Sequence, residues 1–335
     1  MPQAQAELDL QALTGTRLGP YCSYNPVSRT QIWQWCSAMG DRNPLYLDKV
    51  YQQRAGISSV TAPPAMMQMW SMRDVNMEFA PGSTNAAPYQ IFDTLSEFGY
   101  DSNVAVSYDI TFHRYLAQGD RVHHFTTVVN ITELKNTSLG TGYFVTERVE
   151  YLDQNEALFA EALITYFQYH SAGIQKQAAN EEAPVASRQH PDGWESDFTD
   201  LDFNNLQPGQ ALPELVIPIT HKLIVSGALA TQDFIDVHHN APAARTAAMP
   251  DIFMNILTTC GLSARYLSDW AGPASRLKTL KFKLMAPNVP GDTMIMQGQI
   301  SELSSSDGEN TVSVDFAGKN SRGFHLTGSA SLSLS

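Results

Sequence analysis

The sequence has few cysteines and few basic residues. Its 335 residues include three cysteines, Cys22, Cys36 and Cys260, an odd number without CxxC spacing. This usage indicates free thiols in a reducing compartment rather than a disulfide framework. The 21 basic residues are outnumbered by 34 acidic ones, giving a net charge of −13, which disfavours nucleic acid and anionic membrane surfaces as partners.

Long apolar runs and several familiar motifs are also missing. No uncharged apolar run approaches the roughly 20 residues that a membrane-spanning helix needs. The first residues, Met1 to Glu7, have neither a basic start nor an apolar stretch, so we expect no secretory signal and a cytoplasmic protein. HExxH, GxSxG and Walker sequences are absent, which removes zinc-protease, serine-hydrolase and NTPase interpretations.

Two halves of the chain repeat one order of elements. Helical spacing of apolar residues predicts helices at 29–39 and 223–231, and each is followed by a loop that carries an aspartate, Asp41 or Asp233. Alternating and β-branched segments then predict antiparallel strands in both halves. The predicted strands cover 104–112, 122–132, 144–151, 160–169, 214–220, 279–285, 294–303, 311–316 and 324–334.

The repeat predicts two domains joined by a linker. The segment 176–209 lacks periodicity and is rich in Ala, Asp, Asn, Gln, Pro and Gly. We therefore expect a first domain at 1–175, a linker at 176–209 and a second domain at 210–335. The first domain is longer because it carries an irregular insert at 76–100. Two halves with one element order are expected to pair as a pseudo-dimer within the chain.

The second half places a carboxylate and an imidazole beside an apolar helix. Asp233 and His238 are five positions apart, a spacing suited to handling a water molecule but also common by chance. The apolar segment that follows predicts a buried helix with Pro250 at its first position. The free backbone N–H groups of Asp251 and Ile252 would then stabilise a developing oxyanion.

The stretch from Asp233 to Asp292 resembles the MaoC-like, R-specific enoyl-CoA hydratase family, in which an Asp, four residues and a His precede a central helix. The sequences of residues 249–257 and 268–273 are similar to those of hydratases of bacterial steroid side-chain degradation. The resemblance implies an α+β double hot-dog, with two antiparallel sheets that each wrap a central helix. It implies a hydro-lyase that adds water to the α,β double bond of a bulky acyl-CoA, giving an R-3-hydroxyacyl-CoA. Coenzyme A is then part of the substrate, and no cofactor is expected.

In the first half the family motif is altered. The sequence from Gly40 to Tyr46 resembles Gly-Asp-x-Asn-Pro-x-His, with Tyr46 in the place of the His. Tyrosine has an unperturbed pKa of about 10, so it is not a base at neutral pH. We therefore expect the first domain to be non-catalytic and to shape the acyl pocket. Met66, Met69 and Trp70 are candidates for the pocket wall, with plain core packing as an equal alternative.

A basic cluster in the second half is a candidate for contacting the phosphates of coenzyme A. Lys281 and Lys283 lie close in sequence to Arg276 and Lys278. A positive patch of this kind binds phosphate oxygens, although a solvated strand face explains the same residues equally well.

Other assignments stay open. A hot-dog thioesterase would direct water at the thioester carbonyl, and a non-catalytic acyl-CoA-binding protein would use both halves structurally. Asp236 and His239 share the loop with the proposed pair but match no catalytic position of the family, so they are interpreted as loop hydrogen bonders. Without a further ligand cluster they do not indicate zinc. A homodimer is also open, since hot-dog sheets often pair again.

Overall fold

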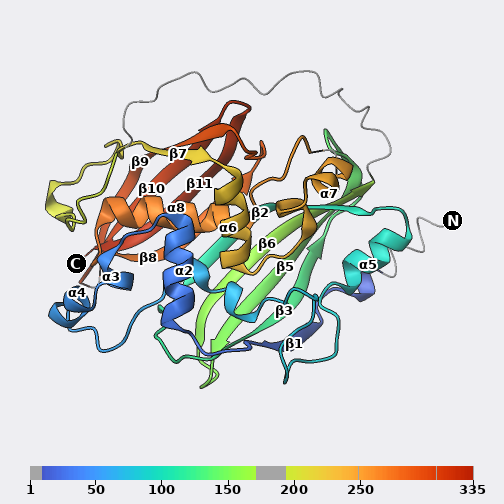
Figure 1. The fold of residues 1–335 in the computed structure, drawn as a ribbon, viewed down its shortest axis with the longest axis horizontal. Coiled ribbons are helices and arrows are strands. Elements are labelled where there is room, and N and C mark those ends of the chain that lie inside the picture. The colour runs from blue at the N-terminus through green and yellow to red at the C-terminus, as the bar shows by residue number, and fades with distance from the viewer. Residues whose placement is uncertain (1–9, 171–193, 248, 307, 335) are drawn as a thin grey trace.

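A long antiparallel sheet forms the centre of the computed structural model, which describes residues 10–170 and 194–334 except 248 and 307. Its strands are arranged in the order β1-β3-β5-β6-β2-β8-β11-β10-β9-β7, with β4 paired to β5 (Figure 1). The strands are β1 (Arg17–Cys22), β2 (Ser102–Phe112), β3 (Val122–Ile131), β4 (Lys135–Thr137), β5 (Gly140–Asp153), β6 (Leu158–His170), β7 (Leu215–Ile219), β8 (Arg276–Leu284), β9 (Asp292–Ser306), β10 (Glu309–Asn320) and β11 (Gly323–Leu334). The predicted α+β architecture and all nine predicted strands are confirmed.

The two expected sheets are joined into one. Strand β2 of the first half pairs antiparallel with β8 of the second, with Tyr108 opposite Phe282 and their rings 6.2 Å apart. Both side chains are buried because they point to the face of the sheet that the helices cover. The backbone hydrogen bonds of these two strands therefore make the halves continuous, so the two predicted sheets pair edge to edge as one.

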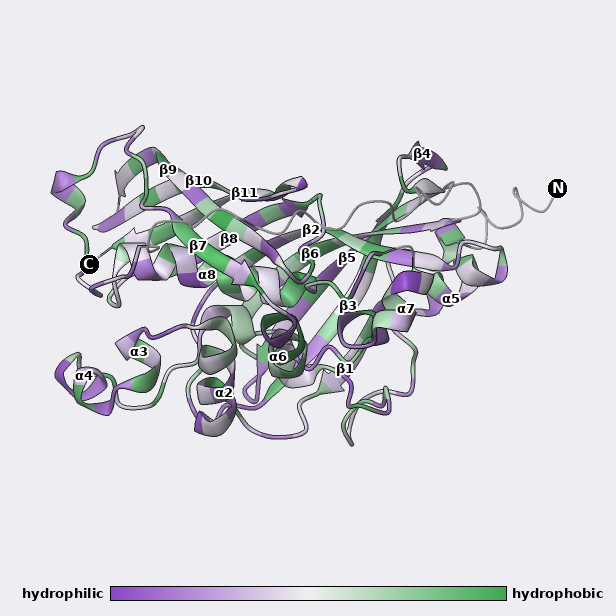
Figure 2. Cartoon of the chain, turned by 45° about the horizontal axis from the view of Figure 1, so that its top comes forward, coloured by the Kyte–Doolittle hydropathy of each residue, from purple (hydrophilic) through white to green (hydrophobic). Residues whose placement is uncertain are grey.

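Helices cover one face of this sheet (Figure 1). The helices are α2 (Arg29–Met39), α3 (Pro44–Leu47), α4 (Lys49–Arg54), α5 (Gln90–Glu97), α6 (His221–Thr231), α7 (Ala241–Thr246) and α8 (Ile256–Ala271), with short 3-10 turns η1 (Pro64–Met66), η2 (Met69–Ser71), η3 (Phe203–Asn205) and η4 (Asp236–His238). Figure 2 shows α2 and α6 side by side below the strands. Apolar residues of the covered face join α2, α6 and α8 in one core. No helix in the described part of the chain has the length and apolar character to span a membrane.

Only the second half contains a long central helix. Helix α8 has 16 residues and buries most of its circumference, whereas the corresponding segment of the first half forms the turns η1 and η2. The apolar segment in the first half is short because a polar turn follows it. In this turn Asp74 accepts hydrogen bonds from the backbone N–H groups of Asn76 and Glu78. The prediction of a central helix in each half is therefore wrong for the first half. In the irregular insert predicted at 76–100, the structure adds one helix, α5.

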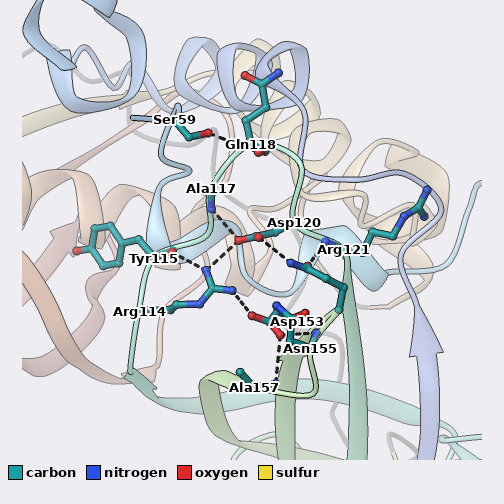
Figure 3. Close-up of polar contacts among 11 residues, drawn as sticks. Ser59, Arg114, Tyr115, Ala117, Gln118, Asp120, Arg121, Asp153, Asn155 and Ala157 are labelled. Carbon is teal, nitrogen blue, oxygen red and sulfur yellow. Dashed lines mark hydrogen bonds and ion pairs between the residues drawn. The ribbon is translucent and has the colours of Figure 1, made fainter. Parts of the chain in front are cut away.

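Asp120 and Asp292, each of which follows a glycine between two strands of its half, both stabilise strand connections. Arg114 binds Asp120 at 2.8 Å and also binds Asp153, whose carboxylate holds the following turn (Figure 3). In the second half Asp292 accepts a 2.6 Å hydrogen bond from the hydroxyl of Ser321. These aspartates stabilise loops and lie outside the cavity described below.

The predicted linker falls partly outside the described residues, at 176–193. Its described part packs against the end of α8. The Ser196 hydroxyl donates to the backbone carbonyl of Asp269 at 2.6 Å, and the Leu201 N–H donates to that of Ala271 at 3.2 Å. All three cysteines are free, as expected from their number, and Cys36 and Cys260 are buried.

Candidate functional site

Asp233 is held at the end of helix α6. Thr220 caps the start of the helix with a hydroxyl that accepts from the N–H of Leu223, and Gln232 caps its end with left-handed backbone at φ 55°. The Asp233 N–H then donates to the Ala228 carbonyl at 3.0 Å. This hydrogen bond closes the helix end and turns the Asp233 side chain toward the neighbouring helix α8.

His238 lies beside this carboxylate in a defined tautomer. Its Nδ1 is 2.8 Å from the carbonyl oxygen of Phe253. Because a carbonyl only accepts, Nδ1 carries a proton, and when the ring is neutral Nε2 is the acceptor. Nε2 lies 3.6 Å from Oδ2 of Asp233, too far for a direct hydrogen bond but close enough for one water molecule to touch both atoms. Both residues are buried, at 7% and 6% exposure.

Asn255 connects this pair to helix α8. Its side-chain Nδ2 donates to Oδ2 of Asp233 and to the hydroxyl of Thr231, both at 2.9 Å, while its Oδ1 accepts the N–H of Thr258 at 2.8 Å as the N-cap of the helix. The other carboxylate oxygen of Asp233, Oδ1, is buried without a hydrogen-bond partner among the described residues.

The predicted start of the central helix is wrong. Helix α8 begins at Ile256, because Asn255 supplies a side-chain cap and the Met254 N–H donates to the Asn288 carbonyl in a non-helical segment. Pro250 therefore does not occupy a first helical position.

The assignment of oxyanion donors changes with the helix start. Asp251 and Ile252 precede α8, and the Ile252 N–H already donates to the Asp251 carboxylate at 2.7 Å. The first N–H groups of α8 are those of Ile256 and Leu257, which line the cavity beside the Asp–His pair.

A cavity of about 460 Å³ lies at the contact between the two halves. Asp233, His238 and Asn255 line it from the second half, and Gln68 and Tyr166 are among the residues that line it from the first. Two of the apolar side chains that line it are exposed, Met77 at 40% and Ile235 at 47%. The insert also contributes Tyr89, Phe92, Asp93 and Ser96.

The predicted acyl-wall residues lie elsewhere. Met66, Met69 and Trp70 are buried in the core and do not line this cavity. The segment forms 3-10 turns rather than an α-helix, which changes the direction of each side chain, so Gln68 and Met72 face the cavity instead. Core packing, the alternative interpretation of the methionines, is the one that the structure supports.

Lys281 and Lys283 are exposed on the far face of strand β8. Their neighbours Leu280 and Phe282 point to the covered face, and successive side chains of a strand alternate between faces. The two lysines therefore do not line the cavity. They lie on a solvent-exposed strand face, which was the alternative interpretation. A basic residue that the sequence analysis missed, Arg73, does line it.

The equivalent place in the first half is filled. Asp41 accepts the N–H of Asn43 at 2.9 Å, as expected for a turn residue, and Tyr46 is buried. Burial raises the pKa of the Tyr46 hydroxyl well above its usual value, so the phenol stays protonated. Arg265 of α8 fills the adjacent space and donates to the Met39 carbonyl at 2.9 Å. A hollow of only about 10 Å³ remains beside these side chains.

Asp236 and His239 lie on the outside of the same loop, at 69% and 41% side-chain exposure. Their side chains are 3.7 Å apart and do not line the cavity. Within the described ranges no group of three or more His, Cys, Asp or Glu side chains is arranged to hold a metal ion.

Comparison with known proteins adds sequence relatives. Residues 12–162 match the model of the FAS1-like dehydratase domain region. The chain is 34% identical over 186 residues to a probable enoyl-CoA hydratase alpha subunit of Thermomonospora curvata, covering 55% of this chain and 57% of that protein. It is 42% identical over 126 residues to the beta subunit of a 3-oxo-4,17-pregnadiene-20-carboxyl-CoA hydratase of Mycobacterium tuberculosis, covering 38% of this chain and 95% of that one.

Solved structures share the fold. A MaoC-like dehydratase superposes with a TM-score of 0.73 at 19% identity, covering 97% of this chain and 100% of that chain. A conserved hypothetical protein of Mycobacterium tuberculosis with a double hot-dog fold has a TM-score of 0.61 at 15% identity, with 97% of each chain covered. At these identities the likeness concerns the fold alone.

Proposed function

The chain belongs to the MaoC-like dehydratase family of hot-dog proteins, and from this premise we propose that it is an enoyl-CoA hydratase in which Asp233 and His238 activate water. The observation that carries the proposal is the pair of acceptors, Asp233 Oδ2 and His238 Nε2, that face each other at 3.6 Å on a cavity wall. A water molecule donates one hydrogen bond to each acceptor in this arrangement. Asn255 keeps the carboxylate in place from the side.

The proposed reaction adds the two parts of this water across the double bond. As the pair removes a proton, the water oxygen bonds to Cβ and the π electrons of the double bond move into the thioester enolate. The pair then returns one proton to Cα, so that H and OH have been added and no other reactant is consumed. The R configuration of the product is the family's expected outcome.

The enolate oxygen requires donors, and the start of helix α8 is the proposed source. Ile256 and Leu257 line the cavity, and their N–H groups are the first of a mostly buried helix. Such groups stabilise a developing negative charge most strongly where water is excluded. In this proposal they replace Asp251 and Ile252.

A bulky acyl group is the proposed substrate class. The cavity of about 460 Å³ has the size of pockets that enclose a drug-sized ligand. Because both halves line it, we assign the first half to shaping the acyl pocket and the second to the chemistry. We propose a steroid side-chain CoA ester as the substrate, because the name of the matched beta subunit specifies such a substrate.

The relatives are named as alpha and beta subunits, which supports an enzyme that combines both in one chain. This chain resembles both an alpha subunit and a beta subunit, which are separate proteins in the relatives. We propose that one polypeptide here supplies both parts, with the acyl pocket completed at the joint between β2 and β8.

Purified protein tests the assignment with steroidal, long-chain and crotonyl enoyl-CoA esters. Loss of the enoyl absorbance without release of free thiol is expected for the steroidal ester. Release of thiol would instead identify a thioesterase, and tight binding without any turnover would identify a binding protein. Either result would overturn the hydratase assignment.

A further inference from the structure

A small polar chamber lies behind the cavity. It has a volume of about 30 Å³ and shares part of its wall with the cavity. The shared residues are Gln68, Met72, Arg73, Tyr89, Ile164 and Tyr166. The remaining wall includes Glu147 of β5 and Thr126 and His124 of β3. We refer to this space as the polar chamber.

Two polar side chains of the chamber are buried without partners. Glu147 is 3% exposed and Thr126 is 5% exposed. Among the described residues, neither Oε1 of Glu147 nor the Thr126 hydroxyl oxygen has a hydrogen-bond partner. Val128 lies directly opposite Glu147 in the β3–β5 pairing, so Thr126, two residues away on the same face, is its diagonal neighbour. Unpartnered buried groups destabilise a fold, which makes their presence on a cavity wall informative.

The Glu147 carboxyl is a hydrogen-bond donor at neutral pH. Burial raises its pKa to about 8, so the protonated form predominates at pH 7. Glu147 forms no ion pair with any residue in the described ranges. The guanidinium of Arg73 lies over the Tyr89 ring at 4.7 Å, and burial lowers the pKa of His124 to about 3, which keeps that ring neutral. The chamber therefore offers the O–H groups of a neutral acid and of a threonine.

The chamber and the Asp–His pair belong to one continuous region. Tyr89 and Tyr166 line both spaces, and the pKa values of their phenols are raised first by burial and then by the nearby acidic groups of Glu147 and Asp233. The exposed residue Ile235 lies at the cavity, whereas the chamber is lined by buried and half-buried side chains. An acyl group whose thioester lies at Asp233 and His238 can therefore extend through the cavity to the wall that the cavity shares with the chamber.

We propose that Glu147 and Thr126 bind a ketone oxygen at the end of the acyl group that is remote from the thioester, an inference that rests on the proposed function. Two O–H donors fit the two lone pairs of a carbonyl oxygen. About 30 Å³ exceeds the roughly 10–15 Å³ that a cavity needs to hold one water molecule and is far below the roughly 150 Å³ of a cavity that holds a benzene ring, so the space accepts an oxygen atom but no ring. The ring system itself then occupies the larger cavity. Glu147 and Thr126 would thereby determine which acyl groups are accepted.

Paired substrates test this proposal. One is a polycyclic enoyl-CoA ester with a ketone on the ring farthest from the thioester, and the other has CH₂ in place of that ketone. We expect wild type to prefer the ketone ester in kcat/KM by about tenfold or more, because a site built to hydrogen-bond a polar group rejects the analogue without it. E147L and T126V should lose the preference through a lower rate on the ketone ester alone. E147Q should retain part of it, since its amide still donates.

A matched substitution controls for removal of a glutamate. Glu161 is partly exposed and its carboxylate lies 3.2 Å from His113, away from the cavity, so E161Q should keep the wild-type preference. Equal kcat/KM for the two esters in wild type would overturn the inference. So would an equal loss on both esters in E147Q and T126V, which would assign these residues a structural role only.

A binding measurement separates this inference from the hydratase assignment. Calorimetry with the saturated ketone and CH₂ esters measures recognition without turnover. If no enoyl ester is hydrated but the ketone ester binds about tenfold tighter, the proposed function fails and the chamber assignment stands. If hydration occurs and both saturated esters bind equally, only the chamber assignment fails.

Discussion

Asp41 and Asp233 occupy equivalent positions in the two halves. Each follows an 11-residue helix that ends in a left-handed residue, and each backbone N–H donates to the carbonyl five residues earlier, at 2.8 Å for Asp41 and 3.0 Å for Asp233. Their surroundings differ. Asp233 faces an imidazole on a cavity wall, whereas Asp41 faces a filled space beside Arg265. One backbone arrangement thus supports a candidate active centre in one half and a structural turn in the other.

This difference leads to a first prediction for the first half. Asn at position 41 can still accept the N–H of Asn43, and Phe at position 46 keeps the buried ring. We therefore expect D41N and Y46F to keep kcat/KM for an enoyl-CoA within about twofold of wild type, as for substitutions outside the reacting centre. A loss of about a hundredfold in either variant, with unchanged thermal stability, would place catalysis in the first half.

Asn255 is expected to be a positioning residue. N255S keeps a good helix cap but removes the amide that binds Asp233, while N255A removes both. Both variants should lose about 10- to 100-fold in kcat with a smaller change in KM, because a displaced carboxylate misaligns the water. N255A should also lose about 1 kcal/mol in the free energy of unfolding, measured in urea. Wild-type kcat in N255S would contradict this role.

Two glycines test how helix packing supports the site. A Cβ at Gly227 of α6 would lie 2.4 Å from the Thr258 hydroxyl, and one at Gly261 of α8 would lie 2.9 Å from the Trp35 ring. G227A and G261A should each reduce the free energy of unfolding by about 1–3 kcal/mol through overpacking.

Only G227A is expected to lower kcat, because it separates the helix that ends at Asp233 from the helix that Asn255 caps. G261A acts on the contact between α2 and α8 and serves as the control. Equal losses of kcat in the two variants, at equal stability, would contradict the claim that packing at Gly227 maintains the hydrogen bond between Asn255 and Asp233.

The pH dependence of stability tests the state of Glu147. The folded state binds the Glu147 proton more tightly than the unfolded state, since burial raises its pKa from 4.5 to about 8. Stability relative to E147Q is therefore fully present below about pH 4.5 and is lost as pH rises toward 8.

Thermal unfolding of wild type and E147Q from pH 4 to 9 measures this difference. The groups that face Glu147, namely Tyr89, Tyr151, Tyr166, His124 and Arg73, are common to both proteins, as is Asp269, whose pKa is raised to about 7 by burial. The comparison therefore isolates Glu147. Parallel curves for the two proteins across this range would contradict a protonated Glu147 in the folded state.

Much of the fold could be predicted from local patterns. The helix at 29–39 was predicted to the residue, because its apolar spacing ends at Gly40, which adopts the left-handed conformation that terminates helices. Strand positions were also predicted well, since alternation between a covered and an exposed face is a local property. The same alternation could have placed Lys281 on the outer face.

The details of the site depend on contacts between distant segments. Pro250 and Asn255 are both plausible helix starts by local rules, and the hydrogen bond from the Met254 N–H to Asn288 decides between them. Glu147 interrupts the buried side of a strand between Val145 and Val149, a local signal of a buried acid that was missed. That its Oε1 has no hydrogen-bond partner in the described part of the chain could not be read from the sequence.

The most direct test of the account is kcat/KM for a steroidal enoyl-CoA in D233N, H238A and the double variant. D236N and H239A are the matched controls, since these side chains are exposed on the same loop. We expect each single variant at the pair to lose about 10²- to 10⁴-fold, the double variant to lose little more than the worse single one, and the controls to stay within about twofold. A near wild-type kcat/KM in H238A or D233N would contradict the assignment of catalysis to this pair.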